Sequence, residues 1–162
     1  MATLLQLVEQ GRVVRIDPAL GVREFEVRRL WALPEACGWI AKELPELAST
    51  WNVEESPIEQ MDALIYEFCA GKPLAIGTRF KSLTHLGDGI WQLKTADLRL
   101  FGWFVKKDAF IVSDCDDAGR IKQSNLYRGY CEQAVRRRNA LELEEPKYLT
   151  GDNPHDVVSD WN

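Results

Sequence analysis

The sequence predicts an α+β protein, with a small antiparallel sheet packed by two helices from the N-terminal half and one C-terminal helix. Three stretches predict this fold class. Residues 86–117 are rich in Ile, Trp, Leu, Phe and Val and contain two turn sequences, which is typical of a three-stranded antiparallel meander. Residues 57–70 repeat apolar side chains at helical spacing. Residues 12–31 have the composition of strands, which we expect to extend the meander.

The length and composition of the chain fit a single domain with a hydrophobic core. It has 162 residues, of which 46% are hydrophobic, and this is enough to enclose a core. We find no apolar run as long as a membrane span and no secretory signal, so we expect a soluble cytoplasmic protein. The four cysteines form no C-x-x-C pair and there are two histidines. We therefore expect reduced, mostly buried thiols, no metal site and no cofactor.

The net charge of −5 is unevenly distributed along the chain. Residues 1–71 carry 6 Lys/Arg and 12 Asp/Glu, residues 72–138 carry 13 and 7, and residues 139–162 carry 1 and 6. The three segments thus have net charges of −6, +6 and −5. A basic middle segment suits phosphate binding, whereas acidic flanks oppose a general attraction to nucleic acid.

The first elements are a short helix and two strands. Thr3 can cap a helix that ends at Gly11. Residues 12–16 and 21–31 have strand composition and are separated by a turn that contains Pro18. In the second stretch polar residues fall on both faces, which favours an edge strand.

Two helices follow. Pro34 suits the first turn of a helix whose expected body is residues 35–44. Ser56 and Glu59 form a capping box around Pro57, and apolar residues then recur at helical spacing. The sequence therefore predicts a core-facing helix over residues 57–70.

The remaining elements are a connection, a last helix and a tail. Residues 72–86 contain Pro and Gly and predict an irregular connection before the meander. After the meander, Ser124 or Asn125 can cap a final helix that ends near Arg138. The acidic residues that follow have no periodicity, so we expect a loosely ordered tail. It would be held only if three side chains contact the rest of the protein: Tyr148, Leu149 and Trp161.

The register of the first hairpin decides whether the meander carries a site. A two-residue turn at Ala96-Asp97 places Lys94 opposite Arg99 on one face, with Gln92 opposite Phe101 beside them. Two opposed cations repel, so an anion would neutralise them, although both could also be solvated on an open face. A turn that also includes Thr95 would put Lys94 and Arg99 on opposite faces.

The meander carries a family resemblance. The sequences LGDGIWQLK (residues 86–94) and LRLF (residues 98–101) resemble the RelE/HigB/ParE toxin superfamily, in its phage-type, HigB-like branch. That branch has the pattern LG-x-G-[LI]-[WY]-E-L-R followed by a strand of the type x-R-x-[FY]. Lys94 stands where the family usually has arginine, Arg99 matches its second arginine, and Gln92 replaces glutamate.

The resemblance covers residues 22–140 and implies a RelE-like toxin domain there. Residues 1–21 would be an N-terminal extension with a short helix and strand, and residues 141–162 the acidic tail. The family implies a toxin of a type II toxin-antitoxin system that cleaves messenger RNA on the ribosome without metal. Its partners would be an antitoxin, the ribosome and messenger RNA.

This cleavage needs a base for the attacking 2′-hydroxyl, an acid for the leaving oxygen and cations for the phosphorane charge. Arginine suits charge stabilisation, lysine can be the base if its pKa is lowered, and tyrosine can be the acid. The candidate catalytic residues are Lys94, Arg99, Lys122 and Tyr127. The candidate RNA-binding residues are Arg120, Arg136, Arg137 and His85.

Two other interpretations stay open at this stage. The chain could be a non-catalytic interaction protein on the same fold, such as a ParE-like topoisomerase inhibitor or a phage accessory protein. The acidic tail could also fold back and mask the basic surface, as an antitoxin segment would. Asp114, Asp116 and Asp117 form an acidic run, but loops favour aspartate, so we do not expect a metal site there.

Overall fold

The structure is a computed structural model that describes residues 1–51 and 53–159. Its centre is a six-stranded sheet with the order β1-β2-β6-β5-β4-β3. The strands are β1 (Val14–Arg15), β2 (Arg29–Ala32), β3 (Phe80–Ser82), β4 (Ile90–Lys94), β5 (Leu98–Lys106) and β6 (Ala109–Asp117). The helices are α1 (Leu4–Glu9), α2 (Pro34–Lys42), the 3-10 turn η1 (Leu44–Glu46), α3 (Pro57–Cys69), α4 (Ala118–Ser124), α5 (Tyr127–Ala140) and α6 (Pro154–Val157).

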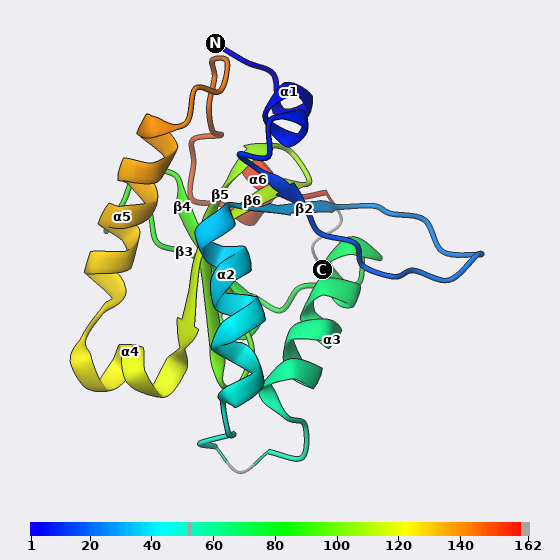
Figure 1. Ribbon diagram of the computed structural model, residues 1–162, viewed down its shortest axis with the longest axis vertical. Helices are drawn as coiled ribbons and strands as arrows, with labels where there is room; N and C mark the ends of the chain where they lie inside the picture. Colours follow the sequence, from blue (N-terminus) through cyan, green and yellow to red (C-terminus); the bar gives the residue numbers. More distant parts are fainter. Residues whose placement is uncertain (52, 160–162) are drawn as a thin grey trace.

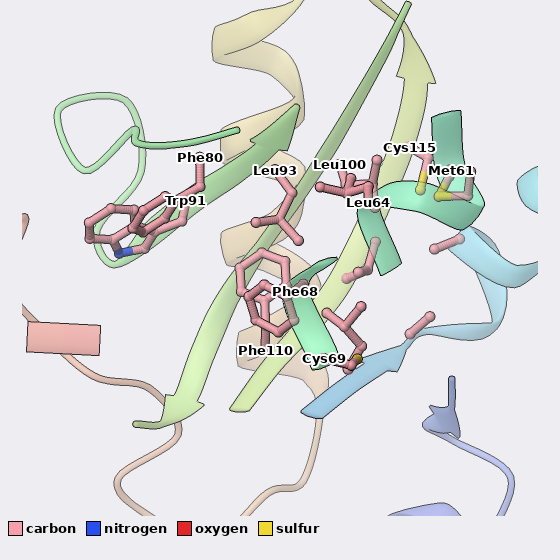
Figure 2. Packing of buried hydrophobic residues seen from close by; sticks show 14 of the residues in the cluster. Met61, Leu64, Phe68, Cys69, Phe80, Trp91, Leu93, Leu100, Phe110 and Cys115 are labelled. Atoms are coloured by element: carbon pink, nitrogen blue, oxygen red, sulfur yellow. The ribbon is translucent and has the colours of Figure 1, made fainter. Parts of the chain in front are cut away.

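The sheet separates two hydrophobic clusters. Helices α2 and α3 cover one face, and α4 and α5 lie on the other, as Figure 1 shows with the sheet seen nearly edge-on. On the α3 side, Leu64 and Phe68 of α3 pack with Trp91, Leu93 and other strand residues (Figure 2). Because both faces are covered, the central strands are apolar on both sides. The fold is thus α+β as predicted, but its mixed sheet is larger than the small antiparallel sheet that we expected.

The predicted meander is confirmed. Strands β4, β5 and β6 pair antiparallel in sequence order. A two-residue turn joins β5 to β6, and Asp108 takes a positive φ of 64° in it. A bulge lies between Phe101 and Gly102 of β5.

The N-terminal strands differ from the prediction. β2 is not an edge strand, because it lies between β1 and β6 and is parallel to β6. Its short run buries apolar side chains on both faces, which is typical of an internal strand. Residues 22–28, which we assigned to this strand, lie outside the sheet, and Val22 and Phe25 are exposed. Alternating sequence alone did not show where the strand begins.

The helices follow their start signals closely. Ser56 and Glu59 form the predicted capping box at the start of α3. The predicted last helix is α5, but a further helix, α4, precedes it and ends where Asn125 adopts a left-handed φ of 53°. As a result neither Ser124 nor Asn125 caps α5, whose N-cap is Leu126. The connection 72–86 contains the short strand β3.

The described part of the acidic tail is packed on the protein. Two of the three side chains required for this make contact: the Tyr148 hydroxyl donates a hydrogen bond to Asp88, and Leu149 packs against the cluster on the α3 side. The Leu149 amide also donates to the Phe104 carbonyl (2.8 Å). Trp161 lies outside the described residues. Val157 and Val158 are buried in the cluster on the α3 side. The tail therefore completes the core.

Two further sequence expectations can be compared with the structure. In the described residues no helix is long and apolar enough to cross a membrane. The four cysteines are free thiols, and three of them are buried. Burial raises the pKa of Cys69 to about 11 and the pKa of Cys131 to about 12, so both remain protonated thiols at neutral pH.

Gly102 should be the position in the sheet least tolerant of a side chain. A Cβ there would lie 1.9 Å from the Ile111 carbonyl oxygen on the neighbouring strand, so Gly102→Ala must displace backbone and should lower the free energy of unfolding by about 3 kcal/mol or more. Gly38→Ala, in α2 with no atom within 4 Å of the new Cβ, is the control and should raise it by up to about 1 kcal/mol. Urea denaturation measures both, and equal effects of the two substitutions would contradict this prediction.

Candidate functional site

The first hairpin adopts the register that brings the two cations together. The Thr95 amide donates to the Leu98 carbonyl (3.1 Å), which closes a two-residue turn at Ala96-Asp97. Lys94 lies opposite Arg99, and Gln92 lies opposite Phe101. The alternative three-residue turn is therefore wrong.

A buried polar network fixes this turn to α3. Gln60 of α3 donates to the Asp97 carboxylate (2.6 Å) and accepts hydrogen bonds from the Thr95 hydroxyl (2.7 Å) and the Asp97 amide (2.9 Å). Thr50 donates to the same carboxylate from its amide (3.0 Å) and its hydroxyl (3.1 Å). Asp97 is fully buried. An unpaired buried polar group is costly, so these bonds favour this turn over any shifted one.

The electrostatics of the Asp97 carboxylate agree with this arrangement. Burial alone would raise the pKa of Asp97, but hydrogen bonds from Gln60 and Thr50 outweigh it and hold the pKa below the usual value of 3.8. The carboxylate thus remains charged at neutral pH and accepts the donors around it.

Lys94 and Arg99 line a hollow of about 450 Å³ between the hairpin turn, α3 and the segment before β3, which we call the hairpin hollow. Lys94 Nζ donates to the Gly77 carbonyl (2.6 Å). Arg99 is 4% exposed, and its Nη1 donates to the carbonyls of Thr95 (2.6 Å) and Leu98 (2.8 Å). Its Nη2 makes no hydrogen bond within the described residues. This guanidinium nitrogen can therefore donate a hydrogen bond to an anion in the hollow.

The hairpin hollow is electropositive. Burial lowers the pKa of Lys94, and the neighbouring charges of Arg99, Lys81 and Lys122 lower it further. Arg79, also in the lining, is paired with Glu67 of α3 (3.3 Å). An anion bound here would relieve the mutual repulsion of the cations.

The other two candidate catalytic residues lie beside this pair. The Tyr127 hydroxyl accepts a hydrogen bond from Arg99 Nε (3.3 Å), and the Tyr127 ring packs edge-on against Phe101. Lys122 of α4 lies with its Nζ 4.9 Å from the centre of the Trp51 ring. Lys94, Arg99 and Tyr127 are thus linked by contacts, and Lys122 is linked to Lys94 through its charge.

Three of the four candidate RNA-binding residues line a second hollow, also of about 450 Å³, between α2 and α5, which we call the helix hollow. Arg120 forms an ion pair with Asp116. Arg137 pairs with Asp114 (3.1 Å) and with Glu35 of α2 (3.6 Å). Two of these arginines are therefore already neutralised by carboxylates.

Arg136 and His85 are placed differently. Arg136 lines the helix hollow without a hydrogen bond or ion pair to the described residues, so its charge is available there. His85 is exposed in the connection between β3 and β4 and lines neither hollow. The helix hollow and His85 thus do not join the four candidate catalytic residues.

The sequence did not predict that two aspartates of β6 are buried and neutralise two arginines of the helix hollow. Asp114 and Asp116 are buried strand residues, and Asp116 lies directly opposite Arg99 on β5. The Tyr130 hydroxyl donates to Asp116, and burial together with this bond raises the pKa of Tyr130 to about 12. Their spacing of two residues, which places both on one face of a strand, was the available signal.

One row of charged residues crosses three strands of the sheet beside the hairpin hollow. Lys94, Arg99 and Asp116 are successive neighbours across β4, β5 and β6. Within the described residues, no group of three or more His, Cys, Asp or Glu side chains is arranged to hold a metal ion. The arrangement thus offers cations, a phenol and a lysine of lowered pKa, which are groups for binding an anion and transferring protons.

Known proteins give no further assignment. No family model matches the chain. No curated protein and no solved structure matches it either.

Asp97→Asn should expose the contribution of the hairpin network to stability. The lowered pKa means that the carboxylate stabilises the fold above pH 3.8, and that this stabilisation is lost as the pH falls through the lower folded-state pKa. At neutral pH the substitution should cost about 1–3 kcal/mol of unfolding free energy, because asparagine keeps only one acceptor oxygen and its NH2 group would face a donor from Gln60 or Thr50. The difference from wild type should shrink in acid. Urea denaturation across this range tests it, with the exposed Asp62→Asn as control; a difference independent of pH would contradict the assignment.

Proposed function

We propose that this protein is a metal-independent endoribonuclease of the RelE/HigB toxin type, which acts on messenger RNA at the ribosome. The observation that carries the proposal is the pairing of Lys94 and Arg99 in one hollow, with Tyr127 bonded to the same arginine. The hairpin sequence that resembles the family is the segment that forms this pair. The proposed partners are messenger RNA on the cytoplasmic ribosome and a neutralising antitoxin.

The proposed reaction is attack of a ribose 2′-hydroxyl on the adjacent phosphorus. Lys94 in its neutral form takes the hydroxyl proton, and the lowered pKa favours that form. Arg99 and Lys122 stabilise the negative charge of the phosphorane, Arg99 through its Nη2, which makes no hydrogen bond to the residues that the structure describes. Tyr127 donates its proton to the departing 5′-oxygen. The products are a 2′,3′-cyclic phosphate and a free 5′-hydroxyl, so every proton and bond is accounted for.

The proposed RNA path extends from the hairpin hollow toward the helix hollow. Arg136 has an uncompensated charge there, whereas Arg120 and Arg137 would first have to exchange their carboxylate partners for phosphate. We therefore propose that Arg136 contributes more than Arg120 or Arg137 to binding the RNA backbone in the helix hollow. His85 is proposed as a peripheral RNA contact.

One observation favours a second candidate function, a non-catalytic interaction protein on the same fold, such as a ParE-like topoisomerase inhibitor or a phage accessory protein. Arg99 is buried, and three of its hydrogen bonds hold its own hairpin and Tyr127. An arginine that only stabilises the fold would have the same burial and the same kind of hydrogen bonds. The exposed side chains of Val22 and Phe25 offer an apolar surface of the kind that protein partners cover.

Masking by the acidic tail is a separate proposal that the contacts do not favour. In the described part of the chain, the tail contacts the buried Arg138 near the end of α5, whose guanidinium carbon lies 3.5 Å from the centre of the Tyr148 ring. Glu142 pairs instead with Arg12 (3.7 Å). Since Val157 and Val158 are core residues, removing the tail would also destabilise the fold.

Inducible expression of wild type should arrest growth and produce new messenger RNA 5′ ends inside translated codons. Lys94→Ala/Arg99→Ala should abolish both effects, because it removes the base and the main phosphate ligand. Arg79→Ala, at the rim of the same hollow but paired with Glu67, is the matched control and should retain cleavage. Arrest without cuts would support the ParE-like candidate, while normal growth with folded wild-type protein would contradict the toxin proposal.

The pH dependence of cleavage should report Lys94. The cleavage rate should rise with pH by about tenfold per unit below the lowered pKa of Lys94, since the neutral amine is the active form. Lys94→Arg keeps the charge but cannot act as base, so it should reduce the rate by about a hundredfold or more and remove this pH dependence. Single-turnover cleavage in a reconstituted translation system measures both; an unchanged pH profile in the variant would assign the base elsewhere.

A further inference from the structure

Trp51 is a large aromatic side chain left half exposed beside the hairpin hollow. It is 52% exposed, although tryptophan is among the most costly side chains to leave in water. The backbone that carries Trp51 is held near the hairpin turn, because the preceding residue, Thr50, makes two hydrogen bonds to the Asp97 carboxylate there. Val53, two residues further on, lines the hollow itself.

A cation of the candidate site lies over this ring. Lys122 Nζ lies 4.9 Å from the ring centre, and the connection that carries Trp51 reaches the same end of the sheet as α4 (Figure 1). Lys122 is also close enough to Lys94 to lower its pKa, together with Arg99 and Lys81. The exposed aromatic ring thus lies beside Lys122, whose charge in turn acts on Lys94 of the candidate phosphate site.

This combination is the chemistry that binds single-stranded nucleic acid. Cations follow the backbone phosphates, and an exposed aromatic ring stacks on an unpaired base. If Trp51 only packed against Lys122 to cover the loop, a smaller and less exposed side chain would be enough. Because one face of the ring is near Lys122, a base would stack on the part of the ring that remains open to solvent.

We propose that Trp51 is a stacking platform for an unpaired base of the RNA next to the phosphate held by Lys94 and Arg99. This inference rests on the proposed function, since it takes the hairpin hollow as an RNA phosphate site. It assigns the substrate to single-stranded RNA, because the bases of a duplex are not free to stack on a protein ring. Stacking tolerates every base, so Trp51 adds affinity and position rather than sequence preference.

The test uses the full chain and 2′-O-methyl hexanucleotides, which cannot be cleaved, in low-salt buffer. One oligonucleotide carries bases throughout and the other has abasic residues at its centre. Trp51→Ala should weaken binding of the first by about tenfold and leave binding of the second unchanged. Trp51→Phe should retain most of the affinity. Phe25→Ala removes another exposed aromatic side chain, on the loop before β2, and should change neither.

The outcomes separate this inference from the proposed function. If Lys94→Ala/Arg99→Ala abolishes binding but Trp51→Ala binds the complete oligonucleotide like wild type, stacking is overturned and the phosphate site stands. If Trp51→Ala weakens both oligonucleotides equally, Trp51 supports the loop and the stacking role is likewise overturned. If wild type binds neither oligonucleotide, the proposed RNA site and this inference fail together.

Discussion

The hydrogen bonds around the buried Asp97 carboxylate are the constraint on which the candidate site depends. They link the hairpin turn to Gln60 of α3 and to Thr50 of the preceding connection. A shift of one residue in the β4–β5 register would place Lys94 and Arg99 on opposite faces of the sheet. It would also leave the buried donors around the carboxylate without an acceptor. One network thus determines the register, the pairing of the cations and the position of Trp51.

The sheet also carries carboxylates next to the cations of the hairpin. Asp116 lies opposite Arg99 and accepts hydrogen bonds from Arg120 and Tyr130. The buried carboxylates of Asp114 and Asp116 therefore lie on the β6 side, under α5, whereas Lys94 and Arg99 form no ion pair with the described residues. This separation explains why the two hollows differ: an anion entering the helix hollow competes with internal ion pairs, and one entering the hairpin hollow relieves repulsion. It also explains how a chain with net charge −5 can carry a local anion site.

Local signals in the sequence predicted the local structure well. The capping box at Ser56 predicted the start of α3, because it depends on neighbours within a few residues. The register of the first hairpin was left open between a two-residue and a three-residue turn. Hydrogen bonds to Gln60, 37 residues from Asp97 in the chain, favour the two-residue turn that brings Lys94 and Arg99 together.

Features that depend on distant partners were not predicted. The parallel pairing of β2 with β6 joins segments about eighty residues apart, and no local pattern encodes it. The ion pairs of Arg137 with Glu35 and Asp114 come from three different elements. The tail was expected to be loose because it is acidic and aperiodic, yet Val157 and Val158 fill a gap in the core. In each case tertiary packing supplied the stabilising partner.

The most direct test of this account is to map where a non-cleavable RNA binds. Amide chemical shifts of isotope-labelled protein can be followed by NMR during titration with a 2′-O-methyl oligonucleotide. We expect the shifts to be concentrated at the hairpin hollow, around Gly77, Lys94 and Arg99, and to extend to Tyr127 at the start of α5. Shifts confined to the helix hollow around Glu35 and Gln133, or the absence of any shift, would contradict the claim that the hairpin register creates the site.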